Sequence, residues 1–319
     1  MFKYFSIRFL ILLVAFVVIV SVCFITFEYS NNKIWFRGFT NWELFEMSWE
    51  SYKVFAKGVI TSNDWGEFDA VNSVWQKGLI EIPTTFKIIT YTFIAFISLG
   101  TFLGIFTAYY EGTWIDKVVS YIAILFGSIP EYVTIGILVF IFGVTLGWLP
   151  TFYDPNPDNV LNLFAVIALP VAALSMVPIL KIMRLLRSEL VEQMNSEYIL
   201  LVRCKGFKRL YIMLRHALRN SISPVLTEIP YIFGLVISLS FVIEIAYNIR
   251  GVGYLFYNSV IKVGEISYIL VNIPISVLIA AYYVLSVMVV AYLCNVLMVI
   301  IDPSIILNSK KTKSFHQVD

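Results

Sequence analysis

Residues 196–227 read SEYILLVRCKGFKRLYIMLRHALRNSISPVLT and contain the densest positive charge of the chain. Six lysines and arginines and no acid lie between Arg203 and Asn220, although the whole chain is 59% hydrophobic and only 14% charged. Apolar segments flank the stretch at residues 160–180 and 224–247. Dense positive charge between two apolar segments of this length indicates a loop on the inner side of a membrane.

The composition points the same way for all 319 residues, because so little charge and a mean hydropathy of +0.83 favour a polytopic membrane protein. A net charge of +2 gives no global basic field, which disfavours nucleic acid as a partner. The three cysteines form no CxxC pair, and the two histidines belong to no HExxH motif. We therefore predict neither a disulfide framework nor a metal site.

Six segments have the length of about 20 mostly apolar residues that a bilayer-crossing helix needs. The sequence therefore predicts an all-α polytopic membrane protein with six transmembrane helices. Pro130 lies inside the third segment and predicts a kink there. The predicted spans are Phe9–Phe27, Thr84–Tyr110, Val118–Gly147, Val160–Leu180, Pro224–Tyr247 and Tyr268–Ile301.

The distribution of lysine and arginine predicts the orientation of these spans. With the N-terminus inside, the inner segments contain 15 of these residues and the outer segments contain 7, with Lys87 near the outer end of the second span. Inner loops of membrane proteins are enriched in lysine and arginine. Both termini and the loop at residues 181–223 are therefore predicted to be cytoplasmic.

The outer segment at residues 28–82 contains five of the seven tryptophans. Aromatic residues within it recur at three- and four-residue intervals, as on one face of a helix that Thr40 or Asn41 caps and Gly58 ends. Two interpretations stay open: a helix at the outer membrane interface, where tryptophan is preferred, or a docking surface for an external partner. The predicted aromatic face comprises Trp42, Phe45, Trp49, Tyr52 and Phe55.

Three acids, Glu131, Glu228 and Glu244, lie within or at the ends of predicted spans. An ionised side chain at the centre of a membrane helix costs about 2.5–3.5 kcal/mol, so each needs a reason. They are candidates for lining a translocation path. The alternative is a structural carboxyl that is neutral or reaches the interface, and for Glu244 the two interpretations are evenly balanced. Proton coupling is disfavoured because no chain of further acids and histidines crosses the membrane.

The chain lacks the sequence motifs of common enzymes. It contains no GxxxxGK[ST], no GxSxG and no HExxH, so no catalytic residues and no nucleotide site in this chain are predicted. The GTFLG segment, with Gly100 and Gly104, matches a small-residue spacing that indicates close packing of helices.

The loop at residues 181–223 begins with a predicted continuation of the fourth span out of the membrane. A short helix then runs from Asn195 to Arg203, with Asn195 or Ser196 as cap and Gly206 as stop. Its apolar residues are expected to form a patch that needs the membrane surface or another protein as a partner. The predicted patch comprises Tyr198, Ile199, Leu201 and Val202.

This loop resembles the cytoplasmic loop of inner-membrane permease subunits of ABC transporters, specifically the oligopeptide, dipeptide and nickel class. The similarity is carried by an acid-Tyr-Ile start, an Arg-x-Lys-Gly core, and Arg-His-Ala-Leu-Arg-Asn followed by Pro-Val. GTWIDK, GSIPEYV, LGWLP, VIEIAYNIRGVGYL and IIDPSI extend it over residues 82–306. The matching loop residues are Glu197, Tyr198, Ile199, Arg203, Lys205, Gly206, Arg215, His216, Ala217, Leu218, Arg219, Asn220, Pro224 and Val225.

The resemblance implies the fold of a type I ABC importer permease in a bacterial plasma membrane and a role in importing peptides. Further implied partners are a second homologous permease, two cytoplasmic ATPases that hold ATP and magnesium, an extracellular substrate-binding lipoprotein, and membrane lipid. The short helix is implied to be the coupling helix that seats in an ATPase subunit. Its implied residues are Asn195, Ser196, Glu197, Tyr198, Ile199, Leu201, Val202, Arg203, Lys205 and Gly206.

Three expected regions follow: residues 1–83 hold the first span and the tryptophan-rich segment, 84–306 the five-helix core, and 307–319 a cytoplasmic tail. The sequence departs from the family pattern at Leu201, Val202 and Cys204, where alanines are usual, and this gives a bulkier docking patch.

Two alternatives stay open for the cargo and the energy source. One is import of nickel or a metal chelate, and the other is ion-coupled transport that uses the three glutamates.

Overall fold

The computed structural model describes residues 2–36, 38–67, 73–154, 160–261 and 272–301. Every regular element in these residues is a helix, so the predicted all-α class is confirmed. The elements are α1 (Phe2–Trp35), α2 (Asn41–Ser62), α3 (Val74–Tyr109), α4 (Trp114–Gly127), α5 (Glu131–Leu138), the π-helix η1 (Val139–Thr145), α6 (Val160–Met194), α7 (Glu197–Arg203), α8 (Arg209–Ile212), the π-helix η2 (Met213–Ala217), α9 (Leu218–Ala246), α10 (Val252–Ile261) and α11 (Ile273–Ile301).

Five helices of the described part are long and apolar enough to cross a membrane: α1, α3, α6, the continuous α8–η2–α9, and α11. The segments Trp114–Gly127 and Tyr132–Thr145 make a sixth crossing if they are counted together, with a bend of 106° between them. Pro130 precedes α5 at this bend, as the sequence predicted. A proline lacks the amide that would continue the helix, which explains the break.

Several helices begin earlier than the spans predicted for them, and the difference is largest for the second and fifth spans. α3 begins at Val74 rather than at Thr84, and the helix expected from Pro224 begins at Arg209. The second difference arises because the basic stretch is itself amphipathic, with Ile212, Met213 and Ala217 on a fully buried face. Part of the predicted loop is therefore a helical extension of the fifth span.

The packing divides the chain into two compact units. Among the described residues, the first unit is formed mainly by those of 88–239 and by 289–301. The second unit is formed by residues 6–87 and 240–288. This is a division by packing, and the region boundaries that the sequence suggested at residues 83/84 and 306/307 stay predictions.

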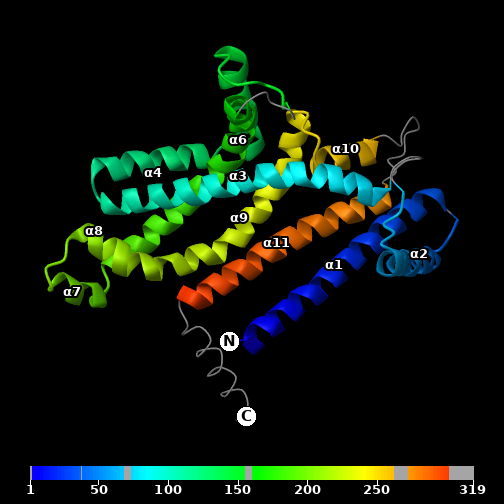
Figure 1. Cartoon of the computed structure of the whole chain (residues 1–319), viewed down its shortest axis with the longest axis horizontal. Coiled ribbons are helices and arrows are strands. Elements are labelled where there is room, and N and C mark those ends of the chain that lie inside the picture. Colours follow the sequence, from blue (N-terminus) through cyan, green and yellow to red (C-terminus); the bar gives the residue numbers. More distant parts are fainter. Residues whose placement is uncertain (1, 37, 68–72, 155–159, 262–271, 302–319) are drawn as a thin grey trace, which may run out of the picture. The chain divides into compact units, whose positions relative to one another are not determined.

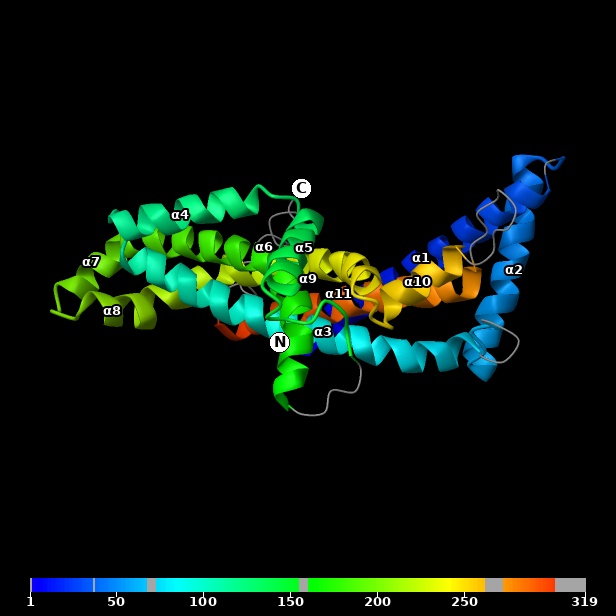
Figure 2. The same cartoon turned by 90° about the horizontal axis from the view of Figure 1, so that it is seen from above.

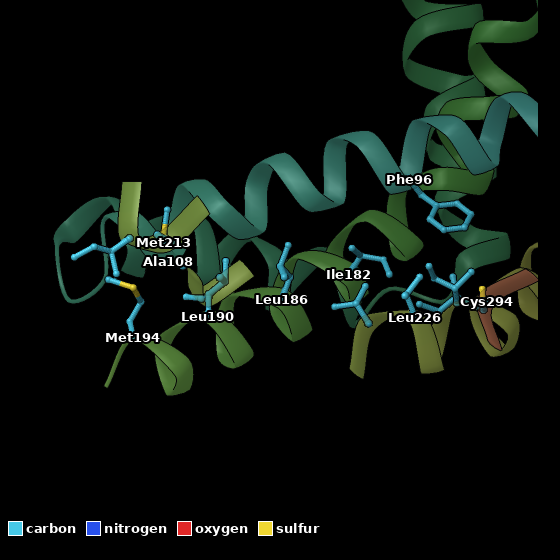
Figure 3. Packing of buried hydrophobic residues seen from close by; sticks show 14 of the residues in the cluster. Phe96, Ala108, Ile182, Leu186, Leu190, Met194, Met213, Leu226 and Cys294 are labelled. Atoms are coloured by element: carbon cyan, nitrogen blue, oxygen red, sulfur yellow. The ribbon is translucent and has the colours of Figure 1, made fainter. Parts of the chain in front are cut away.

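The core of the first unit is built around α6 (Figures 1 and 3). Ile182, Leu186 and Leu190 of α6 are fully buried, and Phe96 of α3 belongs to the same cluster (Figure 3). A Cβ atom at Gly100 would lie 2.8 Å from the Cβ of Ile182, and one at Gly104 would lie 3.0 Å from that of Leu186. The two glycines therefore let α3 and α6 approach closely, which confirms the packing role predicted for GTFLG.

The remaining helices of the first unit surround this pair. α4 and α5 both pack against α6. α7 and α8 lie beside each other at one end of the unit, close to the turn that joins α3 to α4 (Figure 1). Arg203 and Arg209 of the 196–227 stretch line a groove at this end.

The second unit contains a smaller core from α3, α10 and α11, in which Val74, Val252 and Ile275 are fully buried. Its other feature is α2, which lies across the outer part of α1 (Figure 2). The Thr40 side chain accepts the amide of Glu43 while the Glu43 carboxylate accepts the amide of Thr40. The predicted N-cap is thus confirmed and forms a complete capping box.

The packed face of α2 differs from the predicted aromatic face. Leu44 and Ser48 are the buried residues of α2, and the Phe55 ring stacks on Phe24 of α1 with centroids 4.6 Å apart. Trp42 is 72% exposed, and its ring lies 5.9 Å from that of Phe45. The helix also continues beyond Gly58 to Ser62, since Asn63 adopts the left-handed conformation that ends it. The aromatic residues keep their helical spacing, with ring contacts between Trp42 and Phe45 and between Trp49 and Tyr52, so the predicted aromatic side is retained beside the packed residues.

Candidate functional site

α7 is a short helix with one buried and one exposed side. Ile199 is fully buried in the core of the first unit, together with Met194 and Ile212. Leu200 and Leu201 are 51% and 70% exposed. The predicted exposed patch was therefore wrong at Ile199, which is buried and anchors the helix. Leu200, which was not part of the predicted patch, belongs to the exposed side.

Polar contacts hold both ends of α7 to its neighbours. The Arg203 guanidinium donates to the Met194 carbonyl at 2.7 Å, which satisfies a free carbonyl at the C-terminus of α6. The Tyr198 hydroxyl donates to the Gln193 side chain at 2.9 Å and accepts from the Asn220 amide at 3.0 Å. α7 is therefore tied to the end of α6 and to the start of α9.

The predicted cap and stop of α7 are both recognisable. Ser196 stands at the N-cap position, although its hydroxyl donates to the Gln193 carbonyl rather than accepting a helix amide. Gly206 has a φ of +78°, a left-handed conformation that glycine adopts without strain, and the chain reverses there. Asn195 precedes α7 and lines a groove with Arg203, while Lys205 is exposed.

The turn between α3 and α4 lies next to this helix pair. The Arg209 guanidinium lies 3.4 Å from a Glu111 carboxylate oxygen and 3.4 Å from the Ala108 carbonyl. The same guanidinium lies over the Tyr109 ring, 5.9 Å from its centroid. The start of α8 is therefore held against the end of α3.

An ion pair joins α4 to α6 and was not predicted. The Arg187 guanidinium donates two hydrogen bonds to the Asp116 carboxylate, at 2.6 and 2.7 Å. The Asp116 side chain is only 4% exposed and also accepts the amide of Gly112 at 3.1 Å. The signal in the sequence was an acid inside GTWIDK and a basic residue where α6 leaves the membrane, but no spacing rule connects two residues so far apart.

The three glutamates proposed for the translocation path have different environments. The side chain of Glu131 lies outside the described part of the structure. Glu228 is exposed on α9 in the first unit, and Glu244 is fully buried in the second unit. Their role in a path stays a prediction.

Glu244 is held by a network at the N-terminus of α10. Its carboxylate accepts the Thr85 hydroxyl and the Gly253 amide, each at 2.6 Å. The Thr85 oxygen in turn accepts the Val252 amide at 2.8 Å. The carboxylate and the hydroxyl therefore satisfy amides of the first turn of α10, a position where the helix dipole favours negative charge.

Metal ligation has no support from this geometry. Among the described residues, no group of three or more histidine, cysteine, aspartate or glutamate side chains is arranged to hold a metal ion. α7 thus combines an exposed apolar side with polar contacts that hold it to α6 and α9.

The family model described as binding-protein-dependent transport system inner membrane component matches residues 100–307, which is more than half of the chain. The chain belongs to this family. It is accordingly a permease component of an ABC transport system and a multi-pass protein of the cytoplasmic membrane. The resemblance seen in the loop sequence is thereby confirmed.

Individual relatives include two named dipeptide transport system permease protein DppB. The one from Bacillus subtilis (strain 168) is 29% identical over 265 residues, or 81% of this chain and 80% of the relative. The one from Lactococcus lactis subsp. cremoris (strain MG1363) is 27% identical over 258 residues, with the same two coverages.

A protein of Brucella abortus (strain 2308) named as a peptide transport system permease is 34% identical over 181 residues. That match covers 56% of this chain and 58% of the Brucella protein, so the aligned part spans somewhat more than half of that relative. Among solved structures, the methionine ABC transporter MetNI in inward-facing conformations aligns with a TM-score of 0.48 at 18% identity. The alignment covers 72% of this chain and 94% of that one.

Proposed function

We propose that this chain forms half of the translocation path of an ATP-driven peptide importer and that α7 couples it to an ATPase subunit. Family membership supports the transport role, and the peptide and dipeptide names of the relatives support the cargo. The observation that carries the proposal is the two-sided α7. Ile199 fixes the helix to the core, while Leu200 and Leu201 are exposed.

The coupling role rests on how α7 is tied to two membrane-crossing helices. Through Arg203 it holds the end of α6, and through Tyr198 it holds the start of α9. A displacement of α7 by a bound protein therefore moves the ends of both helices together. Differential contact of α7 with the ATP-bound and ATP-free states of the partner is what would shift the permease between its conformations.

The proposed complex contains a second homologous permease, two cytoplasmic ATPases and an extracellular substrate-binding lipoprotein. ATP and magnesium are held by the ATPases, because this chain has no P-loop motif. The proposed part of this chain is to transmit movement and to enclose the cargo.

The test of coupling is a cross-link from α7 to the ATPase. A cysteine at Leu201, in a background with Cys204→Ser because Cys204 is itself exposed, should cross-link to the co-expressed ATPase. The yield should differ between the ATP-bound and ATP-free states. A cysteine at Leu293, which is 54% exposed on α11, is the matched control and should give no cross-link. Equal yields from both positions, or a yield that nucleotide does not change, would refute coupling through α7.

The test of cargo is uptake in a strain that lacks this chain. Labelled di- and oligopeptides should fail to enter, and the plasmid-borne chain should restore their uptake. Loss of nickel uptake with normal peptide uptake would favour the metal-chelate alternative. Uptake that persists after ATP depletion but collapses with the ion gradient would favour an ion-coupled transporter.

A further inference from the structure

Residues 207–214 place an apolar stripe on the outside of the first unit. Phe207, Leu210, Tyr211 and Leu214 are 46%, 47%, 48% and 45% exposed. Leu210, Tyr211 and Leu214 lie on one side of the helical stretch that begins at Arg209, and Phe207 precedes it directly. The opposite side is buried, with Ile212 and Met213 in the core.

The stripe carries positive charge along its length. Lys208 and Arg215 line a shallow groove together with Leu210, Tyr211 and Leu214. The rings of Phe207 and Tyr211 stack on each other with centroids 5.0 Å apart, so they present one continuous apolar surface. There is no acid between residues 203 and 220 to neutralise this charge. An apolar stripe edged by lysine and arginine has the chemistry that binds the interface of an anionic membrane.

The contacts of Arg209 fix the position of the stripe relative to α3. Arg209 binds the Ala108 carbonyl at the end of α3 and Glu111 in the turn between α3 and α4. Directly after this turn, Trp114 begins α4 and is 72% exposed. Exposed tryptophan is enriched where a membrane helix meets the headgroups. The stripe is therefore held beside the turn that leads to this exposed tryptophan.

We propose that the stripe Phe207–Leu214, with Lys208 and Arg215, binds an anionic phospholipid of the inner leaflet. The acyl chains meet the apolar side chains, and the two cations bind the lipid phosphate. The alternative occupant is a protein subunit, and the test below separates the two. The proposal concerns a face other than the exposed side of α7, so either can fail without the other.

The test places a fluorescent label on the stripe of the full chain in its native complex. Leu214→Cys is labelled with bimane in a background with Cys23, Cys204 and Cys294 changed to alanine, and the complex is placed in nanodiscs. The quenchers are spin-labelled phosphatidylglycerol and spin-labelled phosphatidylcholine. We expect quenching by both lipids and stronger quenching by phosphatidylglycerol. The control is Leu201→Cys on α7, which should stay unquenched.

The charge variants test the headgroup contact. Lys208→Gln and Arg215→Gln should each lower the preference for phosphatidylglycerol by about fivefold, which corresponds to ~1 kcal/mol per charge near an anionic surface. Lys208→Arg and Arg215→Lys should keep the preference. Both residues are exposed, so these changes leave the core intact.

Three results would overturn the proposal. The first is absence of quenching at residue 214, and the second is equal quenching by the two lipids in the unchanged protein. The third is quenching that appears only when the chain is purified without its partner subunits, which would assign the stripe to a protein interface.

Discussion

The hydroxyl of Thr85 lies 2.6 Å from the Glu244 carboxylate, although 159 residues separate the two in the sequence. Together they accept the amides of Val252 and Gly253 at the start of α10. The buried Glu244 carboxylate thus has a structural role in holding the first turn of α10. The two interpretations of Glu244, as a structural carboxyl or as a residue that lines the path, can therefore be distinguished by experiment.

Replacing either residue should destabilise the second unit. Thr85→Val and Glu244→Leu each leave a buried amide without a partner, which costs about 1–3 kcal/mol. We expect a lower melting temperature for the purified complex with both variants. Glu228→Gln, at an exposed acid on α9, is the control and should leave the melting temperature unchanged. If Glu244→Gln abolishes uptake at full thermal stability, Glu244 acts in the path instead.

The glycines of RGVG should tolerate no side chain. A Cβ at Gly253 would lie 2.4 Å from the Cα of Phe241, and this backbone atom cannot rotate away. Gly253→Ala should therefore lower the folded yield of the chain and its melting temperature. Gly136→Ala is the matched control, because a Cβ there meets no atom within 4 Å. Equal yields of the two variants in a membrane-fraction assay would contradict this packing.

The Asp116–Arg187 pair should show strong coupling in a double-mutant cycle. Arg187→Met leaves the Asp116 carboxylate buried without its partner, and removal of one member of a buried pair costs roughly 3–5 kcal/mol. Asp116→Asn should cost less, because its neutral amide needs no counter-charge. The double variant should be less damaged than the sum of the two single changes. Additive losses of unfolding free energy would mean that the two side chains do not depend on each other.

The capping box of α2 should depend on pH. The backbone and side-chain hydrogen bonds from Thr40 hold the pKa of the Glu43 carboxyl below its usual value. A lowered folded-state pKa means that the stabilisation is present above the ordinary carboxyl pKa and is lost as the pH falls through the lowered value. Hydrogen exchange at residues 41–46 should therefore accelerate on acidification beyond its intrinsic rate. Thr40→Ala should remove this pH dependence, whereas Glu46→Gln should retain it.

The sequence was a good guide wherever a local pattern controlled the structure. Apolar length predicted the membrane-crossing helices, Pro130 predicted the break before α5, and Thr40 predicted the start of α2. Each of these signals acts within a few residues of where it is read. The family resemblance was likewise local, because it rested on short motifs.

Features that depend on distant partners could not be read in this way. Whether Ile199 or Leu200 faces the core is decided by the neighbouring Met194 and Ile212, which the helix period alone does not place. The Asp116–Arg187 pair and the Thr85–Glu244 contact join residues from separate helices. The partner of α2 was likewise not predicted: Leu44 and Ser48 are its buried residues, and Phe55 stacks on Phe24 of α1.

Ile199 is buried in the core while Leu200 and Leu201 are exposed, so the two sides of α7 should evolve under different constraints. Residue 199 must suit side chains of its own chain, so its variation among relatives should follow changes at Met194 and Ile212. Residues 200 and 201 are released from that constraint and should vary together with whatever protein they meet. In an alignment of related chains with their neighbouring gene products, residues 200 and 201 should therefore covary with the partner protein. Residue 199 should show no such covariation.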